Sequence, residues 1–159
     1  MAKEIERKFL VRDLSVLAGL SGTPITQGYV ASGGLLVRAR RAGDQAFLTL
    51  KGPRVGLSCD EFEYPIPVED ALSMLTSYST GGAVSKTRYL VPVGAHTFEV
   101  DVFEGGLSGL VVAEVELSDE TEVVELPAWL GREVSHDMAY TNVNLANVAA
   151  TGGALPALS

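Results

Sequence analysis

Charged residues recur at alternate positions along this chain, and they come as pairs of like sign. The acidic pairs are Glu4 and Glu6, Glu61 and Glu63, Glu99 and Asp101, and Glu114 and Glu116, and the basic pairs are Arg38 and Arg40, and Lys86 and Arg88. Carboxylate oxygens are the ligands that hard divalent cations prefer, and guanidinium groups match phosphate oxygens with planar forks of N–H donors. The pattern indicates chemistry on a polyanion that is held together with a divalent cation.

These pairs lie in segments that alternate between charged and apolar residues. In a β-strand residues i and i+2 face the same side, so a strand over 4–11 places Glu4, Glu6 and Lys8 on one face, and Ile5 and Phe9 on the other. Comparable strands are predicted over 26–31, 35–41, 45–50, 60–66, 84–91, 96–103 and 110–117. Helical spacing predicts helices over 68–78, 119–125 and 137–149, and residues 152–159 are expected to form a loose end.

Two arrangements of these strands are compatible with the alternation. For any single strand, a half-buried antiparallel sheet with a charged, solvated face is the simpler interpretation. However, like charges at i and i+2 repel each other, and the Thr, Ser and Gln that usually mix into solvated faces are scarce at these positions. A closed barrel with the charged faces inward resolves both objections. Its apolar faces would then be covered from outside by the helix at 68–78, the segment 119–125 and loops, so that this outer layer supplies the hydrophobic stabilisation.

Composition narrows the class of protein. The chain has 159 residues, 47% of them apolar, and a net charge of −8. This size predicts one domain with a sizeable core, and the acidic balance makes nucleic acid an unlikely partner. No apolar run approaches the ~18 residues of a membrane helix, so no membrane association is expected. The single cysteine, Cys59, fits a reducing cytoplasm; it has no neighbouring histidine, and His96 and His136 lack metal-ligand spacing, so we expect none of the three to be catalytic.

The charged segments resemble, in order, the motifs of the CYTH superfamily, the triphosphate tunnel metalloenzymes. Glu4-Ile5-Glu6-Arg7-Lys8 matches the ExExK signature. Further matching blocks are Gln27-Gly28-Tyr29, Val37-Arg38-Ala39-Arg40, Leu48-Thr49-Leu50-Lys51, Glu61-Phe62-Glu63, Lys86-Thr87-Arg88-Tyr89, Phe98-Glu99-Val100-Asp101-Val102-Phe103 and Ala113-Glu114-Val115-Glu116. The resemblance covers residues 1–150, which we interpret as one CYTH domain followed by a C-terminal tail at 151–159.

The resemblance implies an α+β, mainly β fold: a closed eight-stranded antiparallel tunnel with a charged interior and a few outer helices. It implies an enzyme that uses Mg²⁺ or Mn²⁺ to hydrolyse a phosphoanhydride bond of a triphosphate, most simply inorganic tripolyphosphate to pyrophosphate and phosphate. Two alternatives stay open. One is an enzyme acting on an organic triphosphate, such as a thiamine triphosphatase or an adenylate cyclase; the other is a non-catalytic module that binds polyphosphate or nucleotide. The expected partner is the small-molecule triphosphate, with a homodimer as a possible assembly.

The resemblance also implies roles for individual residues. The metal ligands would come from Glu4, Glu6, Glu61, Glu63, Asp101, Glu114 and Glu116, and the phosphates would be bound by Lys8, Arg38, Arg40, Lys51, Lys86 and Arg88. Lys86, Glu63 and Glu114 are expected to act in catalysis. Two departures stand out: many relatives have a basic residue before the Glu61-x-Glu63 pair, where this chain has Cys59 and Asp60, and the expected lysines of the last helix are replaced by Met138 and Thr141.

Overall fold

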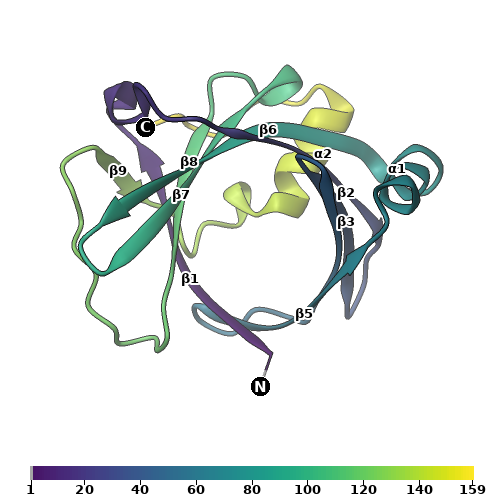
Figure 1. Ribbon diagram of the computed structural model, residues 1–159, viewed down its shortest axis with the longest axis horizontal. Coiled ribbons are helices and arrows are strands. Elements are labelled where there is room, and N and C mark those ends of the chain that lie inside the picture. Colours follow the sequence, from purple (N-terminus) through teal and green to yellow (C-terminus); the bar gives the residue numbers. More distant parts are fainter. Residues whose placement is uncertain (1) are drawn as a thin grey trace.

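The computed structural model describes residues 2–159, and its strands close into a barrel (Figure 1). The strands are β1 (Lys3–Val11), β2 (Thr23–Ala31), β3 (Leu36–Ala42), β4 (Gln45–Lys51), β5 (Ser58–Ile66), β6 (Thr80–Val93), β7 (His96–Phe103), β8 (Val111–Glu116) and β9 (Leu130–Glu133), and the α-helices are α1 (Val68–Ser77) and α2 (Asn142–Thr151). Around the ring the order is β1-β5-β4-β3-β2-β6-β7-β8 and back to β1, with β9 added on β1. The predicted closed eight-stranded antiparallel barrel is confirmed.

Strand β1 closes the ring by changing its neighbours along its length. Residues Lys3–Ile5 pair with β5, whereas Glu6–Leu10 pair with β8 on the opposite edge. β9 then pairs with Phe9 and Val11, on the edge of β1 where the pairing with β5 has ended. The barrel wall therefore parts between β5 and β9, and a cavity lies there, lined by residues of the β4–β5 connection and of the segment after β9.

An apolar layer covers the outside of β1, β7 and β8, as the alternation predicts. Phe9, Phe98 and Val115 are buried in it. Trp129, in the segment leading to β9, packs edge-on against Phe98 with ring centroids 5.4 Å apart. The tryptophan is thus part of the outer packing.

Helix α1 covers another part of the outer surface, over β2, β3 and β4. Its buried residues are Ala71 and Leu75. A Cβ added at Gly28 of β2 would lie 2.9 Å from Ser79 Cβ and 3.0 Å from Leu75 Cδ2, so only glycine allows this close approach. The predicted helix at 68–78 and its outer position are confirmed.

Two other helix predictions need correction. Residues 119–125 form no helix, because the Asp119 carboxylate accepts a hydrogen bond from Thr121 N (2.7 Å) and Glu122 accepts one from Ser118 N (2.8 Å), which favours a turn. The predicted helix over 137–149 begins only at Asn142. A short 3₁₀ helix, Met138–Tyr140, precedes α2. Thr141 is the N-cap of α2, and its hydroxyl accepts a hydrogen bond from Asn144 N (3.3 Å).

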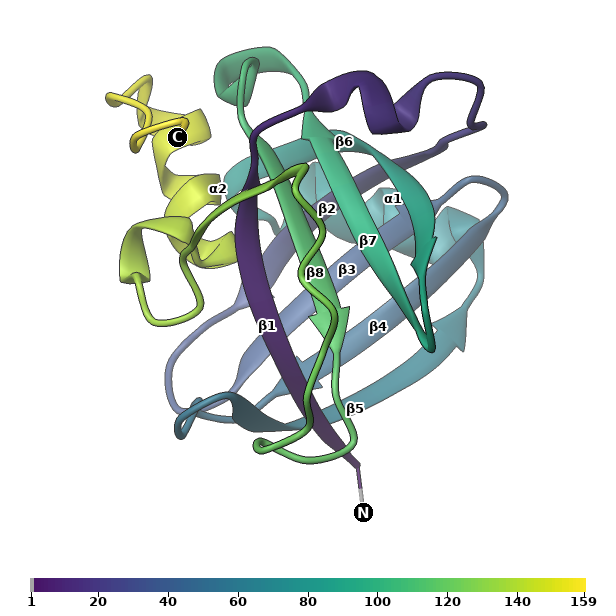
Figure 2. The same cartoon turned by 90° about the vertical axis from the view of Figure 1, so that its left-hand side faces the viewer.

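Helix α2 lies at one end of the barrel (Figure 2) and fills it with apolar side chains. Leu145 of α2 is buried with Leu10, Val84 and Val112, which lie next to the charged residues of β1, β6 and β8 on the same inward faces. The expectation that hydrophobic stabilisation comes from the outer layer alone is therefore wrong, because the interior is charged over only part of its length.

The segment after α2 packs back onto this end of the barrel. The Tyr140 hydroxyl donates to the carbonyl of Ala157, and Leu155 packs against the cluster around α2. Residues 152–159 are therefore not the loose end that composition suggests. Within residues 2–159, neither helix has the length and apolarity needed to cross a membrane.

Candidate active site

The inward faces of seven strands enclose a polar chamber of about 180 Å³. Its lining residues are Glu4, Glu6, Arg38, Arg40, Lys51, Glu61, Glu63, Arg88, Glu99, Glu114, Glu116 and Asn142. All of these except Glu99 and Asn142 are among the residues that the sequence predicts for the site. The like-charged pairs thus turn inward around one shared space.

Three arginines crowd one side of this chamber. The pKa of Arg40 is lowered to about 10 by burial and by the neighbouring charges of Arg38 and Arg88. Its guanidinium is held by Gln27, whose Oε1 accepts from Arg40 Nε (2.8 Å) and Nη2 (2.6 Å). Cations that disfavour one another in a buried space form a site for a polyanion.

Arg38, Thr49 and Glu63 lie side by side on β3, β4 and β5, because the strand register places them directly opposite one another. The buried Thr49 hydroxyl donates to Glu63 Oε2 (2.7 Å) and accepts from Arg38 Nη2 (3.3 Å). Arg38 Nε is buried without a hydrogen-bond partner within residues 2–159. The guanidinium of this chamber-lining arginine therefore keeps one buried N–H group without an acceptor.

Carboxylates crowd the other side. Glu6 and Glu114 lie close enough to share a proton, and burial, together with Glu114 and Glu4, raises the pKa of Glu6 well above its usual range. Burial also raises the pKa of Glu114, but Lys8, the hydrogen bond with Glu6, and Lys86 outweigh it and hold that pKa well below its usual range. Of this pair, Glu6 therefore has the higher pKa.

Glu4 is neutralised by cations from β4 and from the loop between β4 and β5. Lys51 Nζ lies 3.0 Å from Glu4 Oε2 and 3.4 Å from Glu61 Oε2, and Arg54 Nη2 lies 3.0 Å from the same Glu4 oxygen. Burial alone would raise the pKa of Glu4, but Lys51 and Arg54 lower it. Glu4 is thus ionised inside the barrel.

Lys86 and Asp101 lie behind the chamber and do not line it. Both are 1% exposed, and Lys86 Nζ is 2.7 Å from Asp101 Oδ2, an ion pair without hydrogen-bond geometry. Asp101 also accepts from Arg88 Nε (2.8 Å) and Nη2 (2.9 Å). In this conformation the Asp101 carboxylate therefore binds two cationic side chains, those of Lys86 and Arg88.

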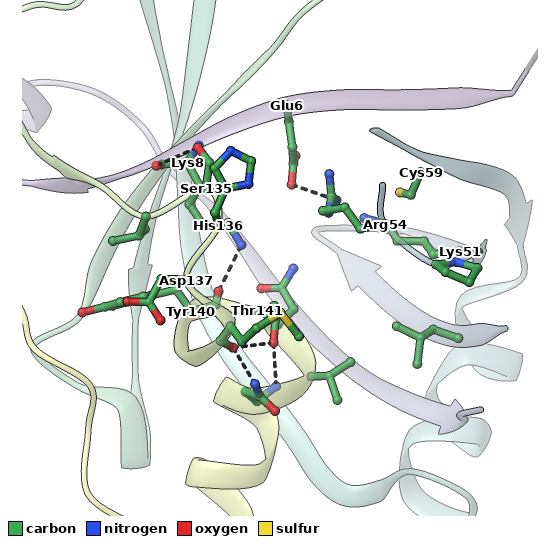
Figure 3. Close-up of a pocket in the computed structure, with 18 of the residues that line it drawn as sticks. Glu6, Lys8, Lys51, Arg54, Cys59, Ser135, His136, Asp137, Tyr140 and Thr141 are labelled. Carbon is green, nitrogen blue, oxygen red and sulfur yellow. Dashed lines mark hydrogen bonds and ion pairs between the residues drawn. The ribbon is translucent and has the colours of Figure 1, made fainter. Parts of the chain in front are cut away.

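Lys8 faces a second, larger cavity of about 550 Å³, which shares Glu6, Lys51 and Asn142 with the chamber. Figure 3 shows this cavity between β1, the loop that carries Arg54 and the segment before α2. Lys8 Nζ donates to the carbonyl of Tyr140 (3.1 Å) and lies 4.0 Å from Glu114 Oε1. Its charge is thus available where the two cavities meet.

The donor set of the chamber fits a divalent cation. Hard cations prefer carboxylate oxygens, and here carboxylates from β1, β5 and β8 face one small space, with Glu6 and Glu114 in contact. Across residues 2–159, no three acidic, histidine or cysteine side chains converge closely enough to ligate one ion in this conformation. Lys51 and Arg54 hold Glu4 instead, so a cation would have to replace them there.

Sequence reasoning missed several residues of the site. Gln27 and Thr49 carried a signal, since each is a polar residue on an inward face of a predicted strand. Asn142 begins the helix that closes the barrel end. Arg54 carried no signal, because it lies in the β4–β5 connection, outside any alternation.

The Cys59 departure has a clear structural setting. The thiol is buried and donates to Glu4 Oε2 at 3.5 Å, and burial and the Glu4 charge raise its pKa. It is therefore a neutral thiol beside the carboxylates, without the pairing that activates a nucleophile.

Comparison with known proteins gives consistent matches over almost the whole chain. The profile of the CYTH domain family matches residues 2–149. The chain is 41% identical over 146 residues to an inorganic triphosphatase of Acetivibrio thermocellus (91% of this chain, 94% of the relative), and 40% identical over 149 residues to one of Nitrosomonas europaea (90% and 96%). A crystal structure of an inorganic triphosphatase superposes with a TM-score of 0.66 at 37% identity, covering 92% of this chain and 96% of the other.

Proposed function

The chain belongs to the CYTH domain family, and on that premise we propose that it is an inorganic triphosphatase, which hydrolyses tripolyphosphate to pyrophosphate and phosphate. The observation that supports this most directly is the polar chamber, where buried arginines face buried carboxylates across about 180 Å³. A polyanion and a divalent cation together would neutralise both sides.

The arginine side of the chamber binds the phosphates. Arg38, Arg40 and Arg88 present planar N–H groups, and Lys51 adds a point charge beside the carboxylates. Lys8 reaches the same substrate from the junction of the two cavities. Lys86 acts at the back, where its ammonium stabilises the charge of Asp101 and, through it, the position of Arg88.

The carboxylate side would hold the proposed Mg²⁺ or Mn²⁺, with Glu4, Glu6, Glu114 and Glu116 as the central ligands and Glu61 and Glu63 in support. Asp101, also predicted as a ligand, lies behind the chamber and binds Lys86 and Arg88 instead. When bound, this ion supplies neutralisation of the charge on the phosphate oxygens. Phosphoryl transfer is catalysed mainly by such positioning and charge stabilisation, so no Ser, Cys or His nucleophile is required.

Glu63 is proposed to orient the attacking water. Its side chain is 40% exposed, so water reaches it from outside, and Thr49 and Arg38 fix its position. Water attacks the terminal phosphorus, the bond to the bridging oxygen breaks, and pyrophosphate leaves. One proton of the water passes to the Glu63 carboxylate. Glu114, whose pKa is held well below its usual range, stays ionised opposite the arginines.

The larger cavity favours a second candidate, the hydrolysis of an organic triphosphate. Tyr29, Leu36, Val134 and Tyr140 give it apolar walls next to the charged chamber. An organic group attached to the last phosphate would lie against these side chains.

Phosphate release assays separate these functions. Tripolyphosphate, thiamine triphosphate and ATP should each be tested with Mg²⁺, with Mn²⁺ and with a chelator. The proposal expects fastest release from tripolyphosphate and none with the chelator. Turnover of the organic substrates alone would replace it with the second candidate, and tight binding of tripolyphosphate without release would indicate a binding module.

The expected assembly and location belong to the same proposal. Light scattering on the purified protein tests the homodimer, and fractionation of the cells that make it tests the cytoplasmic location. The thiol of Cys59, buried beside Glu4, suits a reducing compartment.

A further inference from the structure

Arg54 contacts both of the first two carboxylates of β1. Its Nη2 lies 3.0 Å from Glu4 Oε2 and 3.6 Å from Glu6 Oε1. Figure 3 shows the guanidinium reaching from its loop across the larger cavity toward Glu6. One residue outside the barrel strands thus neutralises the pair that opens the proposed metal site.

The loop that carries Arg54 is a tight turn. Val55 and Ser58 exchange backbone hydrogen bonds (2.8 and 3.1 Å), and Gly56 between them has a φ of +61°. Arg54 Nη1 donates to the carbonyl of Leu57 (2.7 Å), whose N–H donates to Glu120 Oε1 (2.8 Å). The Leu57 carbonyl also accepts from Glu6 N (3.2 Å) and the Leu57 side chain packs against the outer apolar layer, so Glu120 is one of several attachments of this loop.

Arg54 differs from the other cation on Glu4 in its freedom to move. The side chain of Arg54 is 34% exposed, whereas that of Lys51, which belongs to β4, is 14% exposed. Rotation of Arg54 disturbs no apolar core, and its guanidinium borders the larger cavity. It can therefore release Glu4 and Glu6 without unfolding the loop.

We propose that Arg54 is a displaceable counter-ion of the metal site and a phosphate-binding residue of the loaded enzyme. Before substrate binds, it occupies carboxylate oxygens that a divalent cation would need, and so disfavours binding of the free ion. When the ion and the triphosphate enter together, Arg54 leaves Glu4 and Glu6 and binds a phosphate oxygen at the junction of the two cavities. This inference rests on the proposed function.

These contacts of Arg54 would couple the binding of the divalent cation to the binding of the triphosphate. Arg54 competes with the metal ion alone and co-operates with the triphosphate, so it makes the enzyme select the two together. Removing Arg54 should therefore have opposite effects on the two affinities. Simple loss of structure would weaken both.

The test measures Mn²⁺ affinity without substrate by isothermal titration, and the KM for tripolyphosphate at saturating Mn²⁺. For Arg54→Ala we expect the Kd for Mn²⁺ to fall roughly tenfold and the KM to rise roughly tenfold. The matched control is Arg12→Ala, which removes the same charge from an exposed position at the end of β1 and should change neither value.

A second variant acts on the loop and leaves Arg54 in place. Glu120→Ala removes a negative charge, which by itself would weaken Mn²⁺ binding. We expect slightly tighter Mn²⁺ binding instead, because the loop that holds Arg54 loses one of its attachments. Weaker binding would overturn the positioning role of Glu120.

The outcomes separate this inference from the proposed function. If the wild-type protein hydrolyses tripolyphosphate but Arg54→Ala leaves the Mn²⁺ affinity unchanged, the counter-ion role is overturned. Tighter Mn²⁺ binding with an unchanged KM overturns the phosphate-binding role. If the wild-type protein neither binds Mn²⁺ nor releases phosphate, the proposed function fails and this inference fails with it.

Discussion

The interior of the barrel is charged in one half and apolar in the other, although the same strands line both. On β1 the inward face runs Glu4, Glu6, Lys8 and then Leu10, which is fully buried against α2. Comparable changes occur on β6, β7 and β8. On each strand the change takes one step of two residues, roughly 6.7 Å.

The charged half is unfavourable for the stability of the folded state, whereas the apolar half stabilises it. In the charged half, the pKa of Glu6 is raised well above its usual range by burial and nearby carboxylates, and that of Arg40 is lowered to about 10 by burial and nearby arginines. These groups are held in unfavourable surroundings until a ligand arrives. In the apolar half, Leu145 and its neighbours stabilise the fold by leaving water. Binding and stability are therefore separated along the barrel axis.

The largest effect that this comparison predicts is on activity in the charged half. Glu6→Gln keeps the shape of the side chain but removes the charge, so hydrolysis of tripolyphosphate should fall by roughly 1,000-fold. The thermal midpoint should stay the same or rise, because a carboxyl whose pKa is raised is costly to ionise inside the barrel. The exposed Glu125→Gln serves as the control. Full activity in Glu6→Gln would refute the metal assignment.

The matching change in the apolar half should do the reverse. Leu145→Ala empties space in the end filled by α2, and we expect the free energy of unfolding to fall by about 3 kcal/mol. Turnover per folded molecule should stay within about twofold, since Leu145 does not line the chamber. Urea unfolding measures the first value, and Leu72→Ala, at an exposed leucine of α1, is the control. An equal loss for both variants would contradict the separation.

Sequence alone predicted the charged half well, because its signal is local. A period of two residues puts a charged pair on one face, and the repulsion within each pair argues for a shared ligand, whichever strands become neighbours. The apolar half left a weaker signal. Phe9-Leu10-Val11 and Val111-Val112-Ala113 are apolar on both faces, which is typical of strands buried on both sides.

Other features depend on contacts between distant segments and could not be predicted. Arg54 reaches Glu4 because the β4–β5 connection lies against β1, some fifty positions earlier in the chain. The plugging role of α2 depends on Thr141, which starts the helix at Asn142 and places its apolar face over the barrel end. Neither the contact of Arg54 with Glu4 nor the position of α2 can be derived from the local helix or strand propensity of the sequence.

A smaller effect should follow from removing a support of the charged half. Gln27→Leu deprives the Arg40 guanidinium of the acceptor that fixes two of its N–H groups. We expect the KM for tripolyphosphate to rise about tenfold with little change in kcat, because ground-state binding is what the loosened arginine loses. In an Arg40→Ala background the same change should leave the KM unaltered. A further rise there would show that Gln27 acts on something other than Arg40.

The smallest predicted effect concerns Lys86, which lies where the two halves meet. Its ammonium faces Asp101 on one side and the ring of Phe103, 5.4 Å away, on the other. Burial lowers the pKa of Lys86 to about 8, with Arg40 and Arg88 adding to the effect against the opposing charges of Asp101 and Glu114. In the unfolded chain the pKa is about 10.4.

Below pH 8 both states of the protein hold this proton, so the cost of burying the charge is fully present. Between pH 8 and 10 the folded state releases the proton first, so Lys86 destabilises the fold less as the pH rises. The wild-type protein should therefore gain stability relative to Lys86→Met between pH 7 and pH 9.5. Urea midpoints in the presence of a chelator measure it, with the exposed Lys3→Met as the control. A difference that stays constant with pH would mean that burial does not lower the pKa of Lys86.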